Sequence, residues 1–342
     1  CFKQIEGFGE YGFPESHAAS FALLVYVSSW LKCHYPAAFT AAILNSQPMG
    51  FYKPAQIVRD AQDHGVEVRA VDVNDSEWDN TLEVIEQRGK IEEGWRAPDD
   101  QKTALRLGFR QIKGLKQDAA DNLVSAREDG YWQIELLKDR AGLKRGALEK
   151  LADADGFQSL GLDRRQALWA VKGLSDANPL PLFAHLPEHR FRREPSVTLP
   201  NMSLGENVAA DYKALRLSLK AHPMALLRDS FQPEQLLTCA DLSTAEPGSM
   251  VRLAGVVLIR QRPGSAKGTI FITIEDETGI ANLIIWPHKM ERYRRIVIGS
   301  YLLGLEGKLQ REGIVTHVVA EKLYDFSYRL SYLNGRDTGT RD

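Results

Sequence analysis

Residues 112–124 constrain the fold most, because they join a glycine turn to the apolar spacing of a helix. Gly114 suits a tight turn. The apolar side chains around it recur close to helical spacing, at Ile112, Leu115, Ala119, Leu123 and Val124. A helix start leaves backbone N–H groups unpaired and carries the positive end of the helix dipole. An oxyanion such as a DNA phosphate can bind there, with Lys113 and Lys116 beside it.

The same stretch resembles the helix-hairpin-helix motif. That motif reads hydrophobic-x-Gly-hydrophobic, then four free positions, Ala, two free positions and two hydrophobic residues. Every fixed position is filled here, with Ala120 as the alanine. Taken alone, the stretch is equally compatible with an ordinary helical hairpin that has a glycine in its turn.

A second, less regular hairpin is expected behind the first. Leucines at 143, 148 and 151 mark one helix, residues 154–157 form a turn, and residues 164–171 form the next helix. Gly161 interrupts the pattern. Arg164 and Arg165, at the start of the second helix, could bind phosphate, and an exposed, solvated helix face is the alternative for both.

The chain is longer than a single hydrophobic core usually grows. At 342 residues it is expected to form two or more domains. With 44% hydrophobic and 26% charged residues, the composition is typical of a soluble globular protein. We find neither a membrane-spanning apolar run nor a signal peptide, so we expect a cytoplasmic protein with no membrane partner. Cys1 stands where an initiating Met would be, so we expect a part of a longer protein.

Charge is unevenly distributed along the chain. The net charge is only −2, but residues 51–100 carry 6 Lys and Arg against 13 Asp and Glu. Residues 101–175 carry 14 against 10, and residues 250–324 carry 11 against 7. The two basic stretches are therefore where we expect contact with a nucleic acid.

The N-terminal part is expected to be helical. Helices are predicted over residues 17–35, 37–45 and 54–64. Because the first is small or apolar nearly all round, we expect it to be buried in a larger domain. Residues 75–111 alternate apolar and polar in short stretches, which predicts a small sheet of hairpin strands.

From Met250 the apolar period changes to two. Three strands, a helix over about 287–298 and two further strands are expected, which is the order of an OB barrel. Within the second strand, parity places Ile270, Ile272 and Ile274 inward and Thr269, Phe271 and Thr273 outward.

An outward aromatic residue on this strand can stack on a nucleic-acid base. Phe271 is the stacking residue that we predict, and packing against a helix or a neighbouring domain is the alternative. Arg260, Arg262 and Lys267, in and around the first loop of the barrel, could follow the backbone of a single strand.

Several N-terminal segments resemble the bacterial DNA polymerase III alpha-subunit family. They are residues 12–13, 16–18, 26, 30–32 and 34–37, which look like part of its fingers region. Residues 45–52 and 72–74, with 262–268 and 310–313 in the barrel, resemble the error-prone, damage-inducible branch. The resemblance covers nearly the whole chain and implies the C-terminal part of a polymerase that acts in translesion synthesis and DNA repair.

In that family the fingers close over the incoming deoxynucleoside triphosphate. The resemblance therefore implies that Tyr11, Ser16 and His17 lie near the nucleotide, and helix capping and packing are the alternative roles. Pro14 and Glu15 stand where replicative members commonly have a polar and a basic residue, which removes charge for a phosphate contact.

The catalytic centre is expected outside this chain. Asp153 and Asp155 fall at a helix end, where they do not suit the paired Mg²⁺ ligands of a polymerase. The resemblance places the Mg²⁺-binding carboxylates in a palm domain upstream of Cys1. We therefore expect no catalytic residue, cofactor or metal in this chain, and a chain that binds DNA without polymerising it.

Prolines dominate residues 176–204, which predicts a linker, and a helix is expected over 205–220. Residues 180–183 resemble the hydrophobic end of the sliding-clamp peptide of replicative relatives, but Pro179 stands where Gln is expected. We therefore expect a partner, such as an accessory mutagenesis protein, to supply contact with the clamp.

The predicted fold is α+β and multidomain. It comprises part of the fingers (1–74), a β-hairpin sheet (75–111), tandem helix-hairpin-helix (112–175), a Pro-rich linker and helix (176–249), an OB barrel (250–326) and a polar tail (327–342). Primed duplex and single-stranded template DNA are the expected partners. Two alternatives are a non-catalytic nucleic-acid-binding scaffold and a protein-interaction module for accessory polymerase partners.

Overall fold

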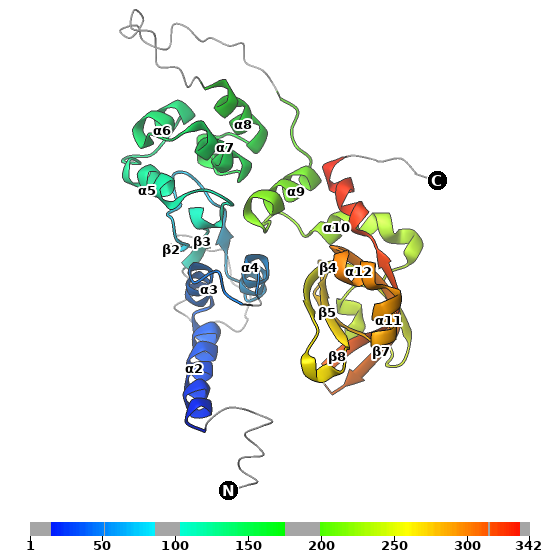
Figure 1. Ribbon diagram of the computed structural model, residues 1–342. Helices are drawn as coiled ribbons and strands as arrows, with labels where there is room; N and C mark the ends of the chain where they lie inside the picture. The colour runs from blue at the N-terminus through cyan, green and yellow to red at the C-terminus, as the bar shows by residue number, and fades with distance from the viewer. Residues whose placement is uncertain (1–14, 51, 86–102, 175–198, 314, 336–342) are drawn as a thin grey trace, which may run out of the picture. The chain divides into compact units, whose positions relative to one another are not determined.

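The computed structural model describes residues 15–50, 52–85, 103–174, 199–313 and 315–335. The chain divides into two compact units (Figure 1). Cys1–Pro195 and Ala214–Leu217 form the first unit, and Ser196–Lys213 and Ser218–Asp342 form the second. Tyr11 and the clamp-like residues 180–183 lie outside the described residues.

Three helices begin the first unit: α2 (Glu15–His34), α3 (Pro36–Asn45) and α4 (Pro54–Asp63). Pro36 and Pro54 occupy the first helical turn, where a missing N–H leaves no hydrogen bond unmade. None of the helices within the described ranges is both long and apolar enough to cross a membrane.

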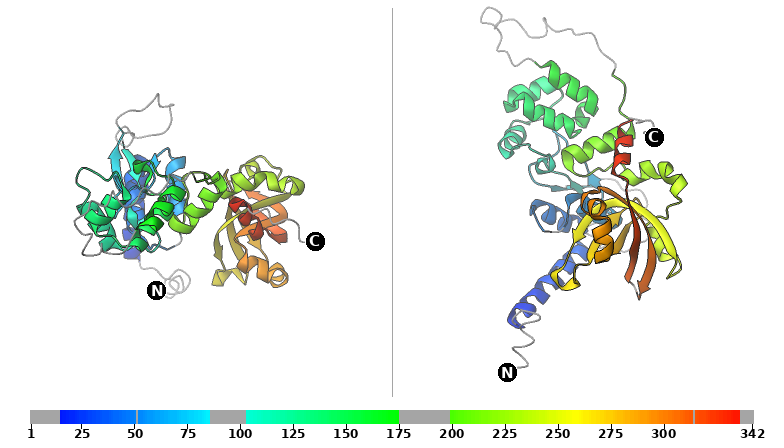
Figure 2. Two further views of the ribbon diagram at one scale, coloured as in Figure 1. Left: turned by 90° about the horizontal axis from the view of Figure 1, so that it is seen from above. Right: turned by 45° about the vertical axis from the view of Figure 1, so that its right-hand side comes forward.

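The first helix is exposed in this chain, and its burial within a larger domain stays a prediction. Figures 1 and 2 show α2 projecting away from α3 as a single helix. Its side chains from residue 17 to residue 31 are exposed, and Tyr26 retains 69% of its accessible surface. The helix is apolar nearly all round, but in this chain only its C-terminal end, with Lys32 bonded to Asp60, reaches the other helices.

The small sheet has three strands: β1 (Val68–Arg69), β2 (Thr81–Val84) and β3 (Thr103–Arg106). Of these, β1 lies outside the predicted range of 75–111. Their order is β1-β3-β2, with β1 parallel and β2 antiparallel to β3. Glu83 joins the strands, because its carboxylate accepts hydrogen bonds from Arg69 and Arg106.

Short helices follow the sheet: η2 (Phe109–Gln111), α5 (Gln117–Ser125), α6 (Ile134–Ala141), α7 (Arg145–Asp153), η3 (Gln158–Leu160) and α8 (Arg164–Gly173). Apolar side chains from these elements and the turns between them are fully buried, among them Phe109, Leu123, Leu137, Leu148, Leu151 and Phe157. The buried positions Leu123, Leu148 and Leu151 are among those that the apolar spacing of the sequence predicts.

The helix predicted over 205–220 is shorter in the structure. It forms α9 (Leu204–Leu215) and ends where Arg216 adopts a positive φ of 64°. Beyond this point the chain folds back, because the buried carboxylate of Asp211 accepts hydrogen bonds from Ser218 and Lys220. Next come α10 (Pro223–Leu227), η6 (Arg228–Glu234) and η7 (Ala240–Ser243).

The second unit is built around a closed barrel of five strands in the order β4-β5-β6-β8-β7. The strands are β4 (Met250–Gln261), β5 (Ile270–Glu275), β6 (Ile280–Ile285), β7 (Leu302–Glu312) and β8 (Val315–Asp325). Between β4 and β5 lies η8 (Gly264–Ala266), and between β6 and β7 lie α11 (Pro287–Arg292) and α12 (Arg294–Gly299). This is the predicted OB order.

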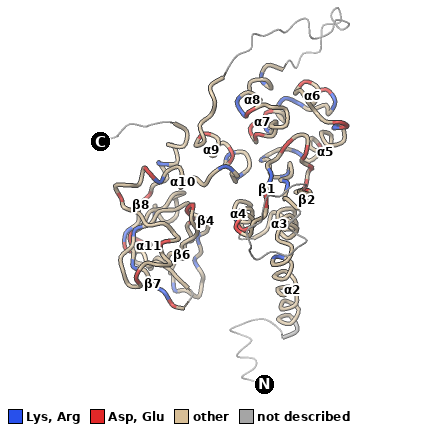
Figure 3. Tube along the Cα trace, turned by 180° about the vertical axis from the view of Figure 1, so that it is seen from behind, with Lys and Arg blue, Asp and Glu red and all other residues tan. Residues whose placement is uncertain are grey.

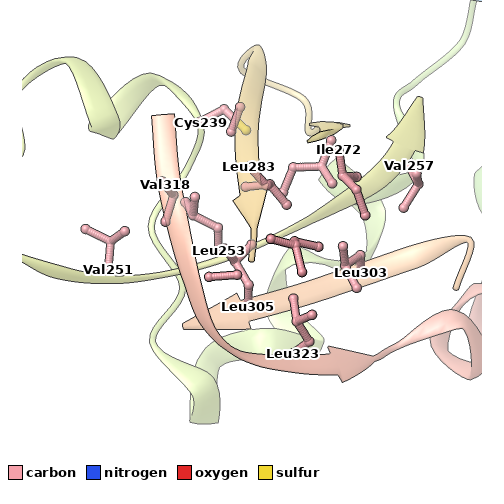
Figure 4. Packing of buried hydrophobic residues seen from close by; sticks show 14 of the residues in the cluster. Cys239, Val251, Leu253, Val257, Ile272, Leu283, Leu303, Leu305, Val318 and Leu323 are labelled. Carbon is pink, nitrogen blue, oxygen red and sulfur yellow. The ribbon is translucent and has the colours of Figure 1, made fainter. Parts of the chain in front are cut away.

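The barrel interior is filled by aliphatic side chains from every strand (Figure 4). The three isoleucines of β5 point inward as predicted, and all are buried. Thr269 was predicted to face outward, but it is buried because it precedes β5 at the end of the loop.

Residues 327–334, predicted as the start of a polar tail, instead form η9 (Ser327–Asn334). Arg329 explains this difference. Its guanidinium lies 4.1 Å from the ring centroid of Phe231 and donates to the carbonyl oxygen of Ser230, which fixes η9 against η6. With a helical region followed by an OB barrel, the predicted fold class is confirmed.

Candidate nucleic-acid interface

The predicted turn at Gly114 is present and opens directly onto α5. Gly114 has a φ of +76°, a conformation that glycine adopts readily. Leu115 is buried beneath the turn, whereas Lys113 and Lys116 are exposed. Lys116 is the N-cap residue, and its side chain makes no capping hydrogen bond. A lysine therefore stands at the positive end of a helix, where an anion would be stabilised.

Part of the backbone at this turn is already engaged. The amide N of Lys113 donates to the carbonyl O of Ala214 over 2.9 Å, so this N–H is not offered to a ligand. Lys150, from α7, donates from Nζ to the carbonyl oxygen of Gly114 and adds another cation beside the turn. Sequence reasoning missed Lys150, because it is 36 residues from Gly114 and only tertiary packing joins them.

Two further helices of the described region begin in the same way. Gly142 (φ +61°) precedes α7 and Gly161 (φ +71°) precedes α8; each is followed by Leu, and each helix begins three residues after its glycine. Gly161 was predicted to interrupt the second hairpin, but it is the counterpart of Gly114. Both have a buried alanine six residues later, Ala120 and Ala167. The repeated Gly-Leu pair was the signal in the sequence.

The three helix starts differ at the N-cap. Lys144 occupies this position in α7, is exposed and makes no capping hydrogen bond, as with Lys116 in α5. In α8 the N-cap is Asp163. Its carboxylate accepts from the amide N of Gln166 at 2.8 Å, and the Gln166 side chain accepts from the amide N of Asp163 at 3.0 Å. The N-terminus of α8 is thus occupied by the protein's own carboxylate.

This geometry corrects one predicted phosphate contact. Arg164 follows Asp163 directly, but its side chain is only 2% exposed and so does not present its guanidinium to solvent. Arg165 is half-buried. Figure 3 shows basic positions interspersed with acidic ones along α5 to α8. The exposed lysines at the Gly114 and Gly142 turns are therefore better placed for an anion than the two arginines.

Asp153 and Asp155 lie at the C-terminal end of α7. Asp155 is buried, has a positive φ of 61° and accepts from Nε2 of Gln158 over 2.9 Å. Within the described residues, no group of three or more His, Cys, Asp and Glu side chains is arranged to hold a metal ion. Residues 154–157 do contain the predicted turn.

The predicted nucleotide-proximal residues are only partly described. Ser16 lies in the first turn of α2. His17 is exposed, and its ring packs edge-on against Phe21 with the centroids 4.5 Å apart. This contact is the packing role that was the alternative for His17. Its part in nucleotide binding stays a prediction.

On the barrel, Phe271 faces outward from β5 and is 38% exposed. Strand register places Thr273, Asn282 and His317 on the same face, because Thr273 pairs with Asn282 and Asn282 pairs with His317. His317 also pairs with Gln310, and their side chains lie 2.9 Å apart. An aromatic ring thus lies beside side chains that can donate and accept hydrogen bonds. Asn282, His317 and Gln310 were not predicted from the sequence as part of this face.

The three predicted cations of the barrel are not equivalent. Nε of Arg260 donates to the carbonyl O of Val297 at 2.7 Å, and its Nη2 donates to the carbonyl O of Ser300. Burial of this guanidinium lowers its pKa, and its bonds hold the end of α12 against β4. Arg262 and Lys267 are exposed in the β4–β5 loop. They are the cations free to reach a ligand that lies on the β5–β6 face, whereas Arg260 has a structural task.

Comparisons with known proteins match these two regions. Residues 65–167 match the family model described as a helix-hairpin-helix motif, and residues 251–325 match the model described as an OB-fold nucleic acid binding domain. Over 97% of its length the chain is 53% identical to an error-prone DNA polymerase of Sinorhizobium medicae. The chain is a homologue of part of the error-prone DNA polymerases.

Other error-prone DNA polymerases show the same relationship. The chain is 52% identical to that of Brucella abortus over 98% of its own length, and 52% identical to that of Ruegeria pomeroyi over 97%. It spans about 31%, 30% and 29% of the lengths of these three relatives. The similarity therefore concerns less than a third of each error-prone DNA polymerase.

Proposed function

We propose that this chain is the C-terminal, DNA-binding part of an error-prone DNA polymerase that acts in translesion synthesis and DNA repair in the cytoplasm. The helix starts at Gly114 and Gly142 grip the duplex, and the β5–β6 face of the barrel holds single-stranded template. The observation that carries the proposal is the repeated turn in which a glycine of positive φ leads to a helix with an exposed lysine at its N-cap.

The two turns suit a duplex because their chemistry recognises phosphate rather than a base. Unpaired N–H groups at a helix start point outward, and the adjacent lysine adds a full positive charge. Lysine is not a favoured N-cap residue, since it has no oxygen to accept a hydrogen bond from the backbone. Its presence in both α5 and α7 is explained if a phosphate oxygen supplies that acceptor.

The barrel suits a single strand because its exposed face combines stacking and hydrogen bonding. Phe271 offers a ring to any base, and Asn282 and Gln310 lie on the same face. Arg262 and Lys267 stand at the loop beside it. Such a surface holds a strand with little sequence preference, as a polymerase that copies damaged template requires.

The phosphoryl-transfer chemistry itself belongs elsewhere in the longer protein. A polymerase of this kind uses paired carboxylates and Mg²⁺ for phosphoryl transfer. We propose that the palm carboxylates lie outside this chain and that the chain binds DNA without polymerising. Contact with a sliding clamp would come through an accessory partner.

The proposal is tested by titrating the chain into fluorescently labelled primed duplex and single-stranded DNA at several salt concentrations. A phosphate grip predicts that the logarithm of the association constant falls linearly with the logarithm of salt, with a slope of about 0.9 per phosphate bound on duplex. Absent binding, or binding that salt does not change, would contradict the proposal and favour the protein-interaction alternative.

A further inference from the structure

Trp286 lies where the β5–β6 face of the barrel meets α11. Phe271 pairs with Ile284, so their side chains share the outward face. Trp286 is two residues further, and its backbone is still extended, with φ −67° and ψ 153°. Ile285, the last residue of β6, pairs with Ile270, so Trp286 lies at the end of β6 that is next to Phe271 on β5. It is 46% exposed.

The β4–β5 loop brings positive charge to the same place. A Cβ atom added at Gly268 would lie 3.5 Å from Nη2 of Arg262 and 3.6 Å from Cγ of Pro287, the residue after Trp286. The guanidinium of Arg262 and the start of α11 therefore border the same point of the loop. Lys267 precedes Gly268 and is exposed.

We propose that Trp286 is a second base-stacking residue, which extends the path of single-stranded DNA from Phe271 toward α11. Two bases stack on the two rings, and Arg262 and Lys267 neutralise the phosphates that join them. This inference rests on the proposed function and goes beyond it, because it assigns a new contact and the direction in which the strand leaves the barrel.

An exposed tryptophan also has a simpler explanation, since single apolar side chains are common on protein surfaces. The chain offers a matched control for this alternative. Tyr324 on β8 is 42% exposed and stacks on Phe326 at 5.9 Å. It pairs with Gly304 of β7, beyond the last residue of β8 that pairs with β6. Tyr324 is thus an exposed aromatic residue outside the β5–β6 face.

The test compares Phe271→Ala, Trp286→Ala, Trp286→Phe and Tyr324→Ala in the whole chain, with labelled oligothymidylates of about 6 and about 12 nucleotides, within the range of OB site sizes. Trp286→Ala should weaken binding of the longer strand by roughly 5- to 150-fold, the equivalent of one lost base stack. Trp286→Phe should retain most of the affinity, and Tyr324→Ala should leave it unchanged. Unfolding midpoints of all four variants report whether the barrel stays folded.

The outcomes separate this inference from the proposed function. If Phe271→Ala weakens binding and Trp286→Ala does not, the second stacking residue is overturned while the single-strand role of the barrel stands. If Trp286→Phe loses as much affinity as Trp286→Ala, stacking on the ring is overturned. Failure of the unaltered chain to bind either oligonucleotide would instead overturn the proposed function and this inference together.

Discussion

The turns at Gly114 and Gly161 have nearly the same backbone and different chemistry. Both glycines have φ above +70°, both are followed by Leu, and both lead into a helix three residues later. Two residues after the glycine, the first turn has Lys116 and the other has Asp163. The lysine leaves the helix start open to an anion, whereas the aspartate fills it with a carboxylate of the same chain.

The difference shows that a turn motif determines a shape and that its N-cap determines what the shape can bind. A helix N-terminus stabilises any negative group, whether it belongs to a ligand or to the protein. The turn at Gly142 resembles the turn at Gly114, because its N-cap residue is also a lysine, Lys144. The pair of turns that we assign to duplex binding is therefore Gly114 with Gly142, and not Gly114 with the helix that begins at Arg164.

The largest effect is expected where the barrel uses the same interaction as Asp163 in a buried setting. Asp276 is fully buried and accepts from the amide N atoms of Cys239 (2.8 Å), Thr278 (2.8 Å) and Gly279 (3.1 Å), and from Arg228 (3.1 Å). Asp276→Asn should lower the free energy of unfolding of the second unit by about 3 kcal/mol. Urea unfolding at neutral pH measures this, and a loss near zero would show that a carboxylate on backbone N–H groups contributes little.

The same variant should change the pH dependence of stability. Burial raises the pKa of Asp276, but hydrogen bonds from Thr278 and Cys239 and the nearby Arg228 outweigh it, so the pKa of this carboxyl lies below its ordinary value. A lowered folded-state pKa stabilises the fold above the unfolded pKa, and this contribution is lost as pH falls through the folded value. The stability difference between the chain and Asp276→Asn should therefore shrink below about pH 4.

Removing both N-cap lysines tests most directly whether the turns at Gly114 and Gly142 bind phosphate. Lys116→Ala with Lys144→Ala should reduce the salt slope of duplex binding by about 1.8 and weaken binding roughly 50-fold near 0.1 M salt, as expected for two lost phosphate contacts. Lys172→Ala, which removes an exposed charge from the last turn of α8, is the matched control. If Lys172→Ala reduces the salt slope by half as much as the double variant does, each lysine contributes equally and only overall charge matters.

A smaller effect is expected when the N-cap residue of the Gly161 turn, Asp163, is replaced by lysine, as at the Gly114 turn. Asp163→Lys should raise duplex affinity by less than about tenfold and add about 0.9 to the salt slope, if the opened helix start then binds a phosphate. It should also lower stability by about 1 kcal/mol, because the cap is lost. Anisotropy titration and thermal unfolding give the two values. An unchanged affinity would show that the backbone at Gly161 does not face the duplex.

The smallest effect is expected from the glycines themselves. An added Cβ at Gly161 meets nothing within 4 Å, and at Gly114 it meets the Lys150 side chain at 3.6 Å. Alanine at either position should therefore lower stability by only about 1 kcal/mol, which is the strain of holding a residue with a Cβ atom at positive φ. Gly114→Ala should also weaken duplex binding by shifting the turn, whereas Gly161→Ala should not. Similar binding by both variants would remove the distinction between the turns.

Local patterns predicted much of the fold, and contacts distant in sequence explain most of the errors. The period-two apolar spacing from Met250 predicted the five strands of the barrel, because alternation decides which face is buried. The helix predicted over 205–220 was too long, because Asp211 draws Ser218 and Lys220 back toward it. The tail was misjudged because the guanidinium of Arg329 packs on Phe231.

The candidate site shows the same contrast between local patterns and contacts distant in sequence. Gly114, its lysines and the outward Phe271 could be identified from the sequence, because glycine conformation and strand alternation are local properties. Lys150 beside Gly114 could not, since it is brought there from α7. The burial of Arg164 and the engagement of Arg260 with α12 also depend on neighbours that no local pattern specifies.

Local patterns in the amino-acid sequence were enough to predict the kind of molecule: a helical region with glycine turns, an OB barrel, and a likeness to error-prone DNA polymerases along most of the chain. Contacts between distant residues determine which of the predicted cations are exposed, which helix starts carry a capping carboxylate, and which side chains share the face with Phe271. The reason is physical. Backbone shape follows from nearby residues. Whether a charged side chain or a helix N-terminus can bind a ligand depends on whether another part of the folded chain already occupies it.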